Sequence, residues 1–400
     1  MFPQVERIFA SSSRMDIRIH LCREPAVYTN EDELAGHVIL KTESQVDVST
    51  ISIKLAGTAA SRLQLAGLTE THQLFKTTEQ LFPPTQCAGS FNSRSVTIPR
   101  GEHAFAFCLK FPHASQCYKS TNLAGKQSSA RRAHHLLRRL PPSSGDKRSP
   151  EEIKYTLEAA VRQDGLIDGT HKAIRDIYLQ TLSTIAFPLH GQNVLTDTKR
   201  ITCSADSSSE FLSLPSTCSV RARLLNGPYL LLGQPISLAV DVMDLNNRSA
   251  DISLHDFQSM LLETTEVRAR GSAEILTRSC VVQTMANLRQ PLVPSRNHEM
   301  EGLVLSLDEK LWSRHRVPLF LTPTFETCNI GRSYKLEIRL GIGFGGHNVR
   351  IVEFQFAVYV VSLPLDRDFG EDDEEDECKD EDEDEDEVPA PAYCEKEFMV

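Results

Sequence analysis

The feature that most constrains the fold is a strict alternation of apolar and polar residues, which recurs along most of the chain. Successive side chains of a strand point to opposite faces, so each alternating run has one face to bury and one face for solvent. Strands of a parallel sheet, buried on both faces, would instead be apolar at nearly every position. The pattern therefore predicts antiparallel strands of β-sandwiches. In the first half of the chain it runs through Ile17–Leu21, Ile51–Leu55, Phe105–Phe111 and Ile153–Val161.

The second half of the chain repeats the pattern, at Val220–Leu224, Ile236–Val242, Tyr334–Leu340 and Val352–Val360. A chain of 400 residues is too long for one ordinary core. We therefore expect an all-β protein with two tandem immunoglobulin-like β-sandwich domains, at 16–201 and 202–365, after a flexible N-terminus at 1–15. Residues 170–187 also fit a helical spacing, but their context favours a strand.

The negative charge of the chain is concentrated near its C-terminus. The net charge is −11, yet residues 371–387 hold 15 acidic residues and one lysine, which gives this stretch −14 and leaves +3 for the rest. Such a run is typical of a disordered segment, so we expect a disordered acidic tail at 366–400. It could act only as a solvating tail, or it could bind basic partners, including a basic loop of the same chain.

That basic loop is expected at 119–150, within the first domain. Residues 119–148 are rich in Ser, Gly and basic side chains, and Asp146 is their only acid. Leucines recur there at helical spacing, which is consistent with a short basic amphipathic helix. The segment could be a solvated loop, or its arginines could contact an anionic lipid surface. The candidate residues for that contact are Arg131, Arg132, Arg138 and Arg139.

No pattern of residues points to catalysis, a metal or a cofactor. The ten cysteines include no C-x-x-C pair, so we expect reduced thiols. Gly341, Gly343 and Gly346 satisfy G-x-G-x-x-G, but they lie between two alternating runs and are better explained as a hairpin. His134 and His135 have no cysteine or acid beside them. We expect a chain that is not an enzyme and binds no cofactor.

The opening residues contain no apolar block of signal-peptide length, and no run is long enough to cross a bilayer. The chain is therefore expected to be cytoplasmic.

A resemblance to fungal arrestin-like proteins rests on several motifs of the first half. The run from Ile98 to Phe107, IPRGEHAFAF, resembles the signature L-P-x-G-x-H-x-F-P-F of arrestin-domain proteins, with Ala106 in place of a proline. Residues 140–145 and 153–159 resemble the pair L-P-P-S-F-G and I-x-Y-x-L-x-A. The run YTNEDELAGHVIL from Tyr28 resembles a third family motif, with Glu31 and Asp32 in place of Gly-Glu. Residues 226–229, 233–234 and 327–330 match more loosely, and the resemblance covers most of 16–365.

The signature residues Pro99, Gly101, Phe105 and Phe107 also have a physical reading. Proline and glycine favour a turn, and the phenylalanines supply large apolar area to a sheet. We expect all four to serve the fold rather than chemistry.

The resemblance implies an α-arrestin, or arrestin-related trafficking adaptor. Such adaptors link membrane transporter or receptor cargo to a HECT-type ubiquitin ligase, for endocytosis and sorting from the plasma membrane or endosomes. Their Pro-Pro-x-Tyr motifs dock on WW domains of the ligase, because a preformed polyproline segment loses little entropy on binding. The nearest candidate is the degenerate motif Ala390-Pro391-Ala392-Tyr393, with Pro391 and Tyr393 as the binding residues.

Two other functions remain open at this point, neither with a nucleic acid as partner. A β-sandwich with an acidic tail suits a histone or basic-protein chaperone, which salt-resistant histone binding would reveal. The same fold suits a retromer-like sorting scaffold, which would co-purify with sorting-complex subunits but without a ligase.

Overall fold

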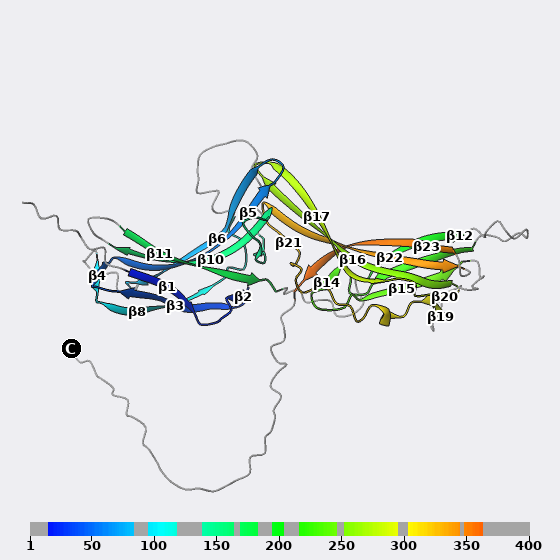
Figure 1. Ribbon diagram of the computed structural model, residues 1–400, viewed down its shortest axis with the longest axis horizontal. Helices are drawn as coiled ribbons and strands as arrows, with labels where there is room; N and C mark the ends of the chain where they lie inside the picture. The colour runs from blue at the N-terminus through cyan, green and yellow to red at the C-terminus, as the bar shows by residue number, and fades with distance from the viewer. Residues whose placement is uncertain are drawn as a thin grey trace, which may run out of the picture. The chain divides into compact units, whose positions relative to one another are not determined.

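The protein is described by a computed structural model at residues 15–83, 95–117, 138–163, 169–182, 194–203, 216–245, 252–294, 303–344 and 348–362 (Figure 1). All the described residues belong to one compact unit. The described part contains 23 strands and a 3₁₀ helix, η2 (Glu309–Leu311). The strands form two groups of sheets, each around its own hydrophobic core.

The first group contains three sheets. A three-stranded sheet has the order β1-β3-β8, a six-stranded sheet has the order β2-β11-β10-β5-β6 with β9 beside β10, and β4 pairs with β7. Their bounds are β1 Met15–Leu21, β2 Val27–Thr29, β3 Glu33–Thr42, β4 Val46–Val48, β5 Thr50–Leu63, β6 Leu68–Phe82, β7 Val96–Ile98, β8 Gly101–Lys110, β9 Ser144–Gly145, β10 Glu151–Gln163 and β11 Gly169–Gln180.

Alternation along these strands builds the first core. Every second residue of β5 is buried, as is every second residue of β10 up to Val161. Tyr155 of β10 is fully buried, stacks on Phe75 at 6.0 Å between ring centroids, and donates its hydroxyl to the Pro141 carbonyl at 2.6 Å. A side chain at Gly57 would place its Cβ 2.7 Å from the Tyr155 ring, so the two rings fill the space that this glycine leaves.

The second group contains two sheets. The five-stranded sheet has the order β12-β13-β15-β20-β19, and the seven-stranded sheet has the order β14-β23-β22-β16-β17, with β18 beside β16 and β21 beside β22. Their bounds are β12 Leu195–Cys203, β13 Ser216–Leu224, β14 Tyr229–Leu231, β15 Leu238–Asp244, β16 Ile252–Ala269, β17 Ser272–Met285, β18 Gln290–Pro291, β19 Val293–Pro294, β20 Leu303–Ser306, β21 Phe325–Glu326, β22 Ile330–Phe344 and β23 Asn348–Val361.

The second core lies between these sheets and contains the single tryptophan. Trp312 is 4% exposed, stacks on Phe257 of β16 at 5.3 Å, and donates its indole N–H to the Leu238 carbonyl at 2.9 Å. Buried residues of β13, β15, β22 and β23 complete the core around these two rings. The satisfied indole N–H explains how a tryptophan can be buried at this position.

One long strand contributes to both cores. Phe257 and Leu261 of β16 belong to the second core, whereas Val267 and Ala269, at its C-terminal end, belong to the first. Phe325 and Ile330 also pack in the first core, although they belong to β21 and β22 of the second group. The β16–β17 hairpin therefore reaches the β5–β6 hairpin of the first group, as Figure 1 shows.

The structure confirms the expected all-β sandwich fold and shows residues 169–180 as a strand. Two short pairings are parallel: β2 pairs with β11, and β14 with β23, over three residues each. A strand of three residues is too short to show an alternating pattern. The sequence therefore did not reveal these two parallel pairings.

The expected domain limits stay predictions. Strand β12, Leu195–Cys203, pairs with β13 of the second group, so residues 195–201 lie with the second group although the sequence assigned them to the first domain. Most of the expected flexible N-terminus, the greater part of the basic loop and the acidic tail lie outside the described residues.

Gly341 and Gly343 lie in β22, where they pair with β23 as part of a hairpin. A Cβ on Gly341 would lie 2.7 Å from Asp256 Oδ2, beside an irregularity in the pairing of β16 with β22. These glycines thus make room for a neighbouring strand, and Gly346 lies outside the described residues.

Candidate functional site

The four signature residues lie in or beside the first core. The Pro99 carbonyl accepts a hydrogen bond from Thr42 Oγ1 at 3.1 Å, and Gly101 begins β8 with a φ of 142°, which glycine adopts readily. Phe107 is buried, and Phe105 packs edge-on against Phe82 at 5.9 Å. This placement supports the fold-building role predicted from the sequence, and that role stays a prediction.

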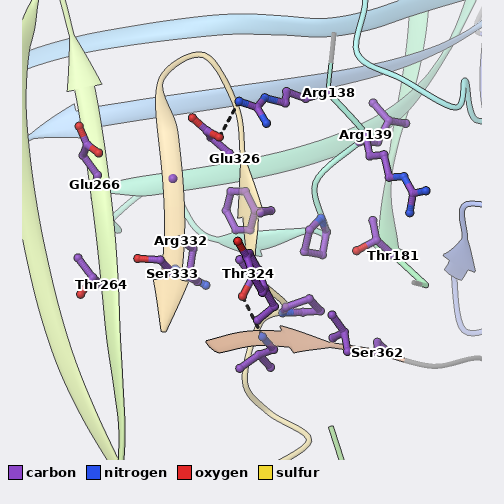
Figure 2. A pocket seen from close by; sticks show the side chains of 18 of the residues that line it. Arg138, Arg139, Thr181, Thr264, Glu266, Thr324, Glu326, Arg332, Ser333 and Ser362 are labelled. Atoms are coloured by element: carbon purple, nitrogen blue, oxygen red, sulfur yellow. Dashed lines mark hydrogen bonds and ion pairs between the residues drawn. The ribbon is translucent and has the colours of Figure 1, made fainter. Parts of the chain in front are cut away.

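A pocket of about 820 Å³ opens where the two groups of sheets meet (Figure 2). Its lining comes from segments that lie far apart in the sequence: the later part of the basic loop, the residues after β11, the strands β16 and β17, the residues from β21 to the start of β22, and the end of β23. Figure 2 labels polar lining residues from all these segments except β17: Arg138, Arg139, Thr181, Thr264, Glu266, Thr324, Glu326, Arg332, Ser333 and Ser362.

Most of the charge around this pocket is paired. Arg138 lies 2.8 Å from Glu326, and Arg268 donates two hydrogen bonds to Glu266, at 2.7 and 2.8 Å. The hydrogen bonds from Arg268 lower the pKa of Glu266, despite its partial burial. Arg139 is exposed at the pocket.

A buried ion pair connects the two groups of sheets near the pocket. Arg332 of β22 lies 2.7 Å from Glu151 of β10, and both side chains are about 5% exposed. Arg332 also contacts Thr265 Oγ1 at 3.3 Å and Glu263 at 3.7 Å. A buried charge is costly unless it is paired and hydrogen-bonded, so this cluster ties the position of one group to the other.

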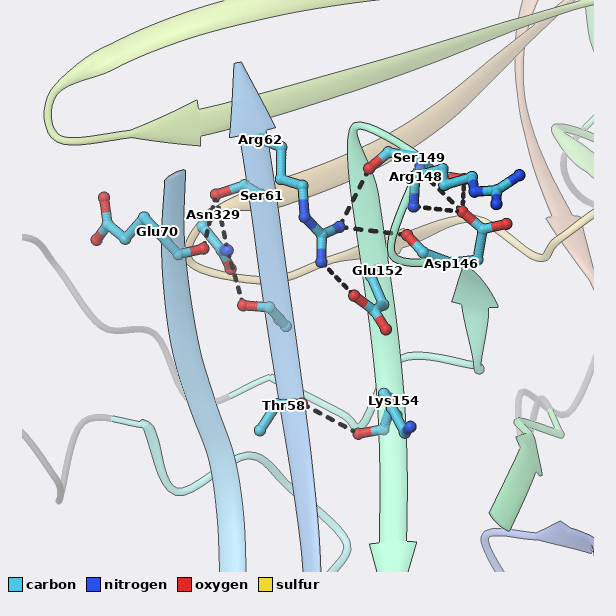
Figure 3. Close-up of polar contacts among 11 residues, drawn as sticks. Thr58, Ser61, Arg62, Glu70, Asp146, Arg148, Ser149, Glu152, Lys154 and Asn329 are labelled. Atoms are coloured by element: carbon cyan, nitrogen blue, oxygen red, sulfur yellow. Dashed lines mark hydrogen bonds and ion pairs between the residues drawn. The ribbon is translucent and has the colours of Figure 1, made fainter. Parts of the chain in front are cut away.

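A second polar contact between the groups is centred on Asn329. Its side-chain amide donates to the Ala59 carbonyl at 3.0 Å and to Ser61 Oγ at 3.1 Å, and both acceptors belong to β5. Figure 3 shows Ser61 and Asn329 side by side, next to the Arg62–Glu152 ion pair. Ser61 in turn donates to the Arg268 carbonyl at 2.6 Å. Asn329 is 1% exposed, so these bonds satisfy an amide that water cannot reach.

A cluster of one histidine and two cysteines lies in the same region. The ligand atoms of His72, Cys117 and Cys328 all lie within 4.8 Å of one another, and His72 Nδ1 is 3.3 Å from Cys117 Sγ. The pKa of His72 is raised, chiefly because of its hydrogen bond with Cys328; burial opposes this, and a hydrogen bond with Glu70 adds to it. The pKa of Cys117 is raised by its hydrogen bond with Cys328 and by burial.

Comparison with known proteins finds a similarity in the N-terminal part of the chain. Residues 17–131 match the family model of the arrestin (or S-antigen) N-terminal domain. This part of the chain is similar to arrestins. Most of β1, the strands β2 to β8 and Cys117 fall within the matched range.

A curated protein that is similar to this chain is the arrestin-related trafficking adapter 10 of Lachancea thermotolerans. The two are 24% identical over 150 residues, which covers 32% of this chain and 33% of the relative. The match thus spans about a third of the relative's length. Within the described residues, no helix has the length and apolar character needed to span a membrane.

The structure reaches only some of the site residues predicted from the sequence. Arg138 and Arg139 line the pocket, and Arg138 is engaged by Glu326. Arg131, Arg132, Pro391 and Tyr393 lie outside the described residues. Contact of the four arginines with an anionic surface and binding of WW domains therefore stay predictions.

Sequence reasoning missed the Arg332–Glu151 pair and the cluster of His72, Cys117 and Cys328. The fold brings their members together from distant segments of the chain. The spacing of these residues in the sequence therefore gave no indication that they would meet. A polar residue inside an apolar alternating run, such as Glu151 at the start of β10, was the available hint.

Proposed function

We propose that this protein is an arrestin-like, non-enzymatic cytoplasmic adaptor that links membrane cargo to a HECT-type ubiquitin ligase for endocytosis and sorting. The observation that carries the proposal is the match of residues 17–131 to the arrestin N-terminal domain, in a chain with two sandwich cores joined by buried polar contacts. The name of the curated relative, a trafficking adapter, supports it. Recruitment to the plasma membrane or endosomes belongs to the same proposal.

The arrangement suits binding better than chemistry. Each sandwich offers exposed strand faces, and the pocket between them has the volume of a small-ligand site but is lined by side chains that already pair with one another. Because the Arg332–Glu151 and Asn329 contacts hold the two groups together, the two sandwiches can present one continuous surface to cargo, while the proposed ligase motif lies in the C-terminal segment.

The ligase arm is tested by capture of the full chain on immobilised WW domains. We expect Tyr393→Ala to lower capture about tenfold or more, because it removes the aromatic residue that the WW groove receives. Ala390→Pro restores a complete Pro-Pro-x-Tyr and should raise capture. Phe398→Ala, in the same tail but outside the motif, is the matched control and should have no effect.

Equal capture of the parent chain and Tyr393→Ala would contradict the ligase link. It would leave the retromer-like sorting scaffold and the histone or basic-protein chaperone as the alternatives. The cargo arm is tested in cells by following ubiquitination and surface turnover of membrane proteins with and without the chain. Unchanged turnover across the membrane proteome would contradict the adaptor proposal as a whole.

A further inference from the structure

The cluster of His72, Cys117 and Cys328 combines the residue types and spacing of a transition-metal site. His72 comes from β6, Cys117 from the stretch after β8, and Cys328 from the turn between β21 and β22. We infer that these three side chains bind Zn²⁺, a site that holds both groups of sheets together. The inference does not depend on the adaptor function.

The distances fit zinc without rearrangement of the backbone. Tetrahedral zinc, with Zn–S of about 2.3 Å and Zn–N of about 2.0–2.1 Å, separates its ligand atoms by about 3.5–3.8 Å. His72 Nδ1 and Cys117 Sγ are 3.3 Å apart, and no pair in the cluster exceeds 4.8 Å. Small side-chain rotations therefore suffice to place three ligands around one ion.

The second nitrogen of His72 has the partner that metal-binding histidines use. His72 Nε2 lies 2.7 Å from Glu70 Oε1, and the other Glu70 oxygen accepts the backbone N–H of Arg270 at 2.5 Å. A carboxylate on the far nitrogen fixes the tautomer that leaves Nδ1 with a lone pair for the metal. Since Arg270 belongs to the β16–β17 hairpin, the second group of sheets also holds this carboxylate in place.

Both cysteines are held by their own backbone contacts. The stretch before Cys117 runs beside β6, where Gln116 N donates to the Leu74 carbonyl at 2.6 Å and Ser115 Oγ donates to the same carbonyl at 3.2 Å. Cys328 lies in a turn closed by Thr327 N donating to the Ile330 carbonyl at 2.7 Å. Asn329, the next residue, is bonded to β5. Ligands fixed in this way lose little entropy when a metal binds.

The ligand chemistry selects the ion. Two thiolates and one imidazole are soft and borderline donors, which favour zinc over the hard, oxygen-seeking Ca²⁺ and Mg²⁺. The two negative charges of the thiolates balance the charge of Zn²⁺. Cys117, which is 4% exposed, can therefore be buried as a thiolate without leaving an unpaired charge in the interior. Three protein ligands leave the fourth position of zinc for water or a partner's side chain.

The test titrates Co²⁺, a spectroscopic probe for tetrahedral thiolate sites, into the full-length chain after chelation and reduction. Excess Mg²⁺ occupies the carboxylates of residues 371–387, and the thiolate-to-cobalt charge-transfer absorption reports sulfur ligands only. We expect saturation at one Co²⁺ per chain, with Zn²⁺ displacing it. Loading with Zn²⁺ should also raise the thermal midpoint of the parent chain.

Variants assign the ligands. Cys328→Ser should abolish the charge-transfer absorption and the thermal shift, and because Cys328 is half-buried in a turn, the fold should survive the change. Glu70→Gln keeps the three ligands but weakens the contact to the other nitrogen of His72, and should lower affinity about 10–100-fold. Cys280→Ser, a half-buried cysteine of β17, is the matched control and should bind as the parent chain does.

Two results would overturn the inference. One is the absence of charge-transfer absorption in the reduced parent chain. The other is equal metal affinity of the parent chain and Cys328→Ser, which would assign the metal to other residues.

Discussion

At the scale of single residues, the acidic pair that replaces Gly-Glu in a family motif has a structural role. Asp32 accepts hydrogen bonds from Arg23 at 2.9 Å and from the backbone N–H of Thr29 at 2.7 Å, and so closes the turn between β2 and β3. Burial raises the pKa of Asp32, but the hydrogen bonds from Arg23 and Thr29 outweigh burial and hold the pKa at about 2, against an ordinary 3.8.

This depressed pKa predicts a pH-dependent contribution to stability. A carboxylate with a lower pKa in the folded state stabilises above its unfolded pKa, and the contribution is lost as the pH falls through its folded pKa. Asp32→Asn should therefore lower the free energy of unfolding by about 1–2 kcal/mol at neutral pH. The difference from the parent chain should shrink as the pH falls from 3.8 to about 2.

Urea denaturation at a series of pH values measures this difference. Asp16→Asn is the control, since Asp16 pairs with Arg18 at 2.7 Å on the exposed surface, where such pairs contribute about 0–1 kcal/mol. A pH-independent loss in Asp32→Asn would contradict the assignment.

At the scale of elements, alternation predicted the strands that face a single core and missed those that do not. β5 and β10 alternate cleanly because one face of each meets the first core. β16 shows no single period, since its pairing with β22 is interrupted between Leu254 and Asp256 and its two ends belong to different cores. β17 is mostly exposed, and because its side chains face no core, its sequence does not need apolar residues at alternate positions. The linking hairpin was therefore the least predictable element.

The tips of the two hairpins are joined by one carboxylate. Glu274 of β17 accepts hydrogen bonds from the backbone N–H groups of Gln64 and Leu65, both at 2.9 Å, in the turn of the β5–β6 hairpin. Bonds to a charged acceptor contribute about 1.5–3 kcal/mol each at most, and less where water competes. Glu274→Ala should therefore loosen this contact without unfolding either core.

Hydrogen exchange measures the effect directly. In Glu274→Ala the amides of Gln64 and Leu65 should exchange about tenfold faster or more, because their acceptor is gone, while amides in the centre of β5 keep their protection. Glu353→Ala removes an exposed carboxylate that pairs with Arg339 at 3.0 Å and should leave both tip amides unchanged. Unaltered exchange at Gln64 in Glu274→Ala would show that the hairpin tips are separate in solution.

At the scale of the whole molecule, the two groups of sheets are coupled through buried polar residues rather than apolar area alone. A single sequence revealed the two sets of strands, but it could not pair Glu151 with Arg332 or Asn329 with β5, because these partners are joined only when both cores have formed. The same reason hides the cluster of His72, Cys117 and Cys328. What the sequence lacked was the relative placement of the groups, and the candidate sites lie where they meet.

Substitutions of the Arg332–Glu151 pair measure how much this coupling contributes to the free energy of unfolding. Arg332→Met leaves Glu151 buried at 3% exposure with its charge uncompensated, so the free energy of unfolding should fall by about 3–5 kcal/mol. The double change Arg332→Met with Glu151→Met removes both charges and should recover most of that loss, because two apolar side chains of similar size can replace a buried pair.

The fluorescence of Trp312, the single tryptophan, reports unfolding of the second core, so its denaturation midpoint measures whether a change at the junction reaches that core. Arg18→Met, which breaks only an exposed pair, should leave the midpoint in place. If the double variant is as unstable as Arg332→Met, the loss comes from packing around Arg332 and not from the stranded charge. Recovery in the double variant would show that Arg332→Met destabilises the chain through the unpaired charge of Glu151, so that this charge must be either paired or absent where the two groups of sheets meet.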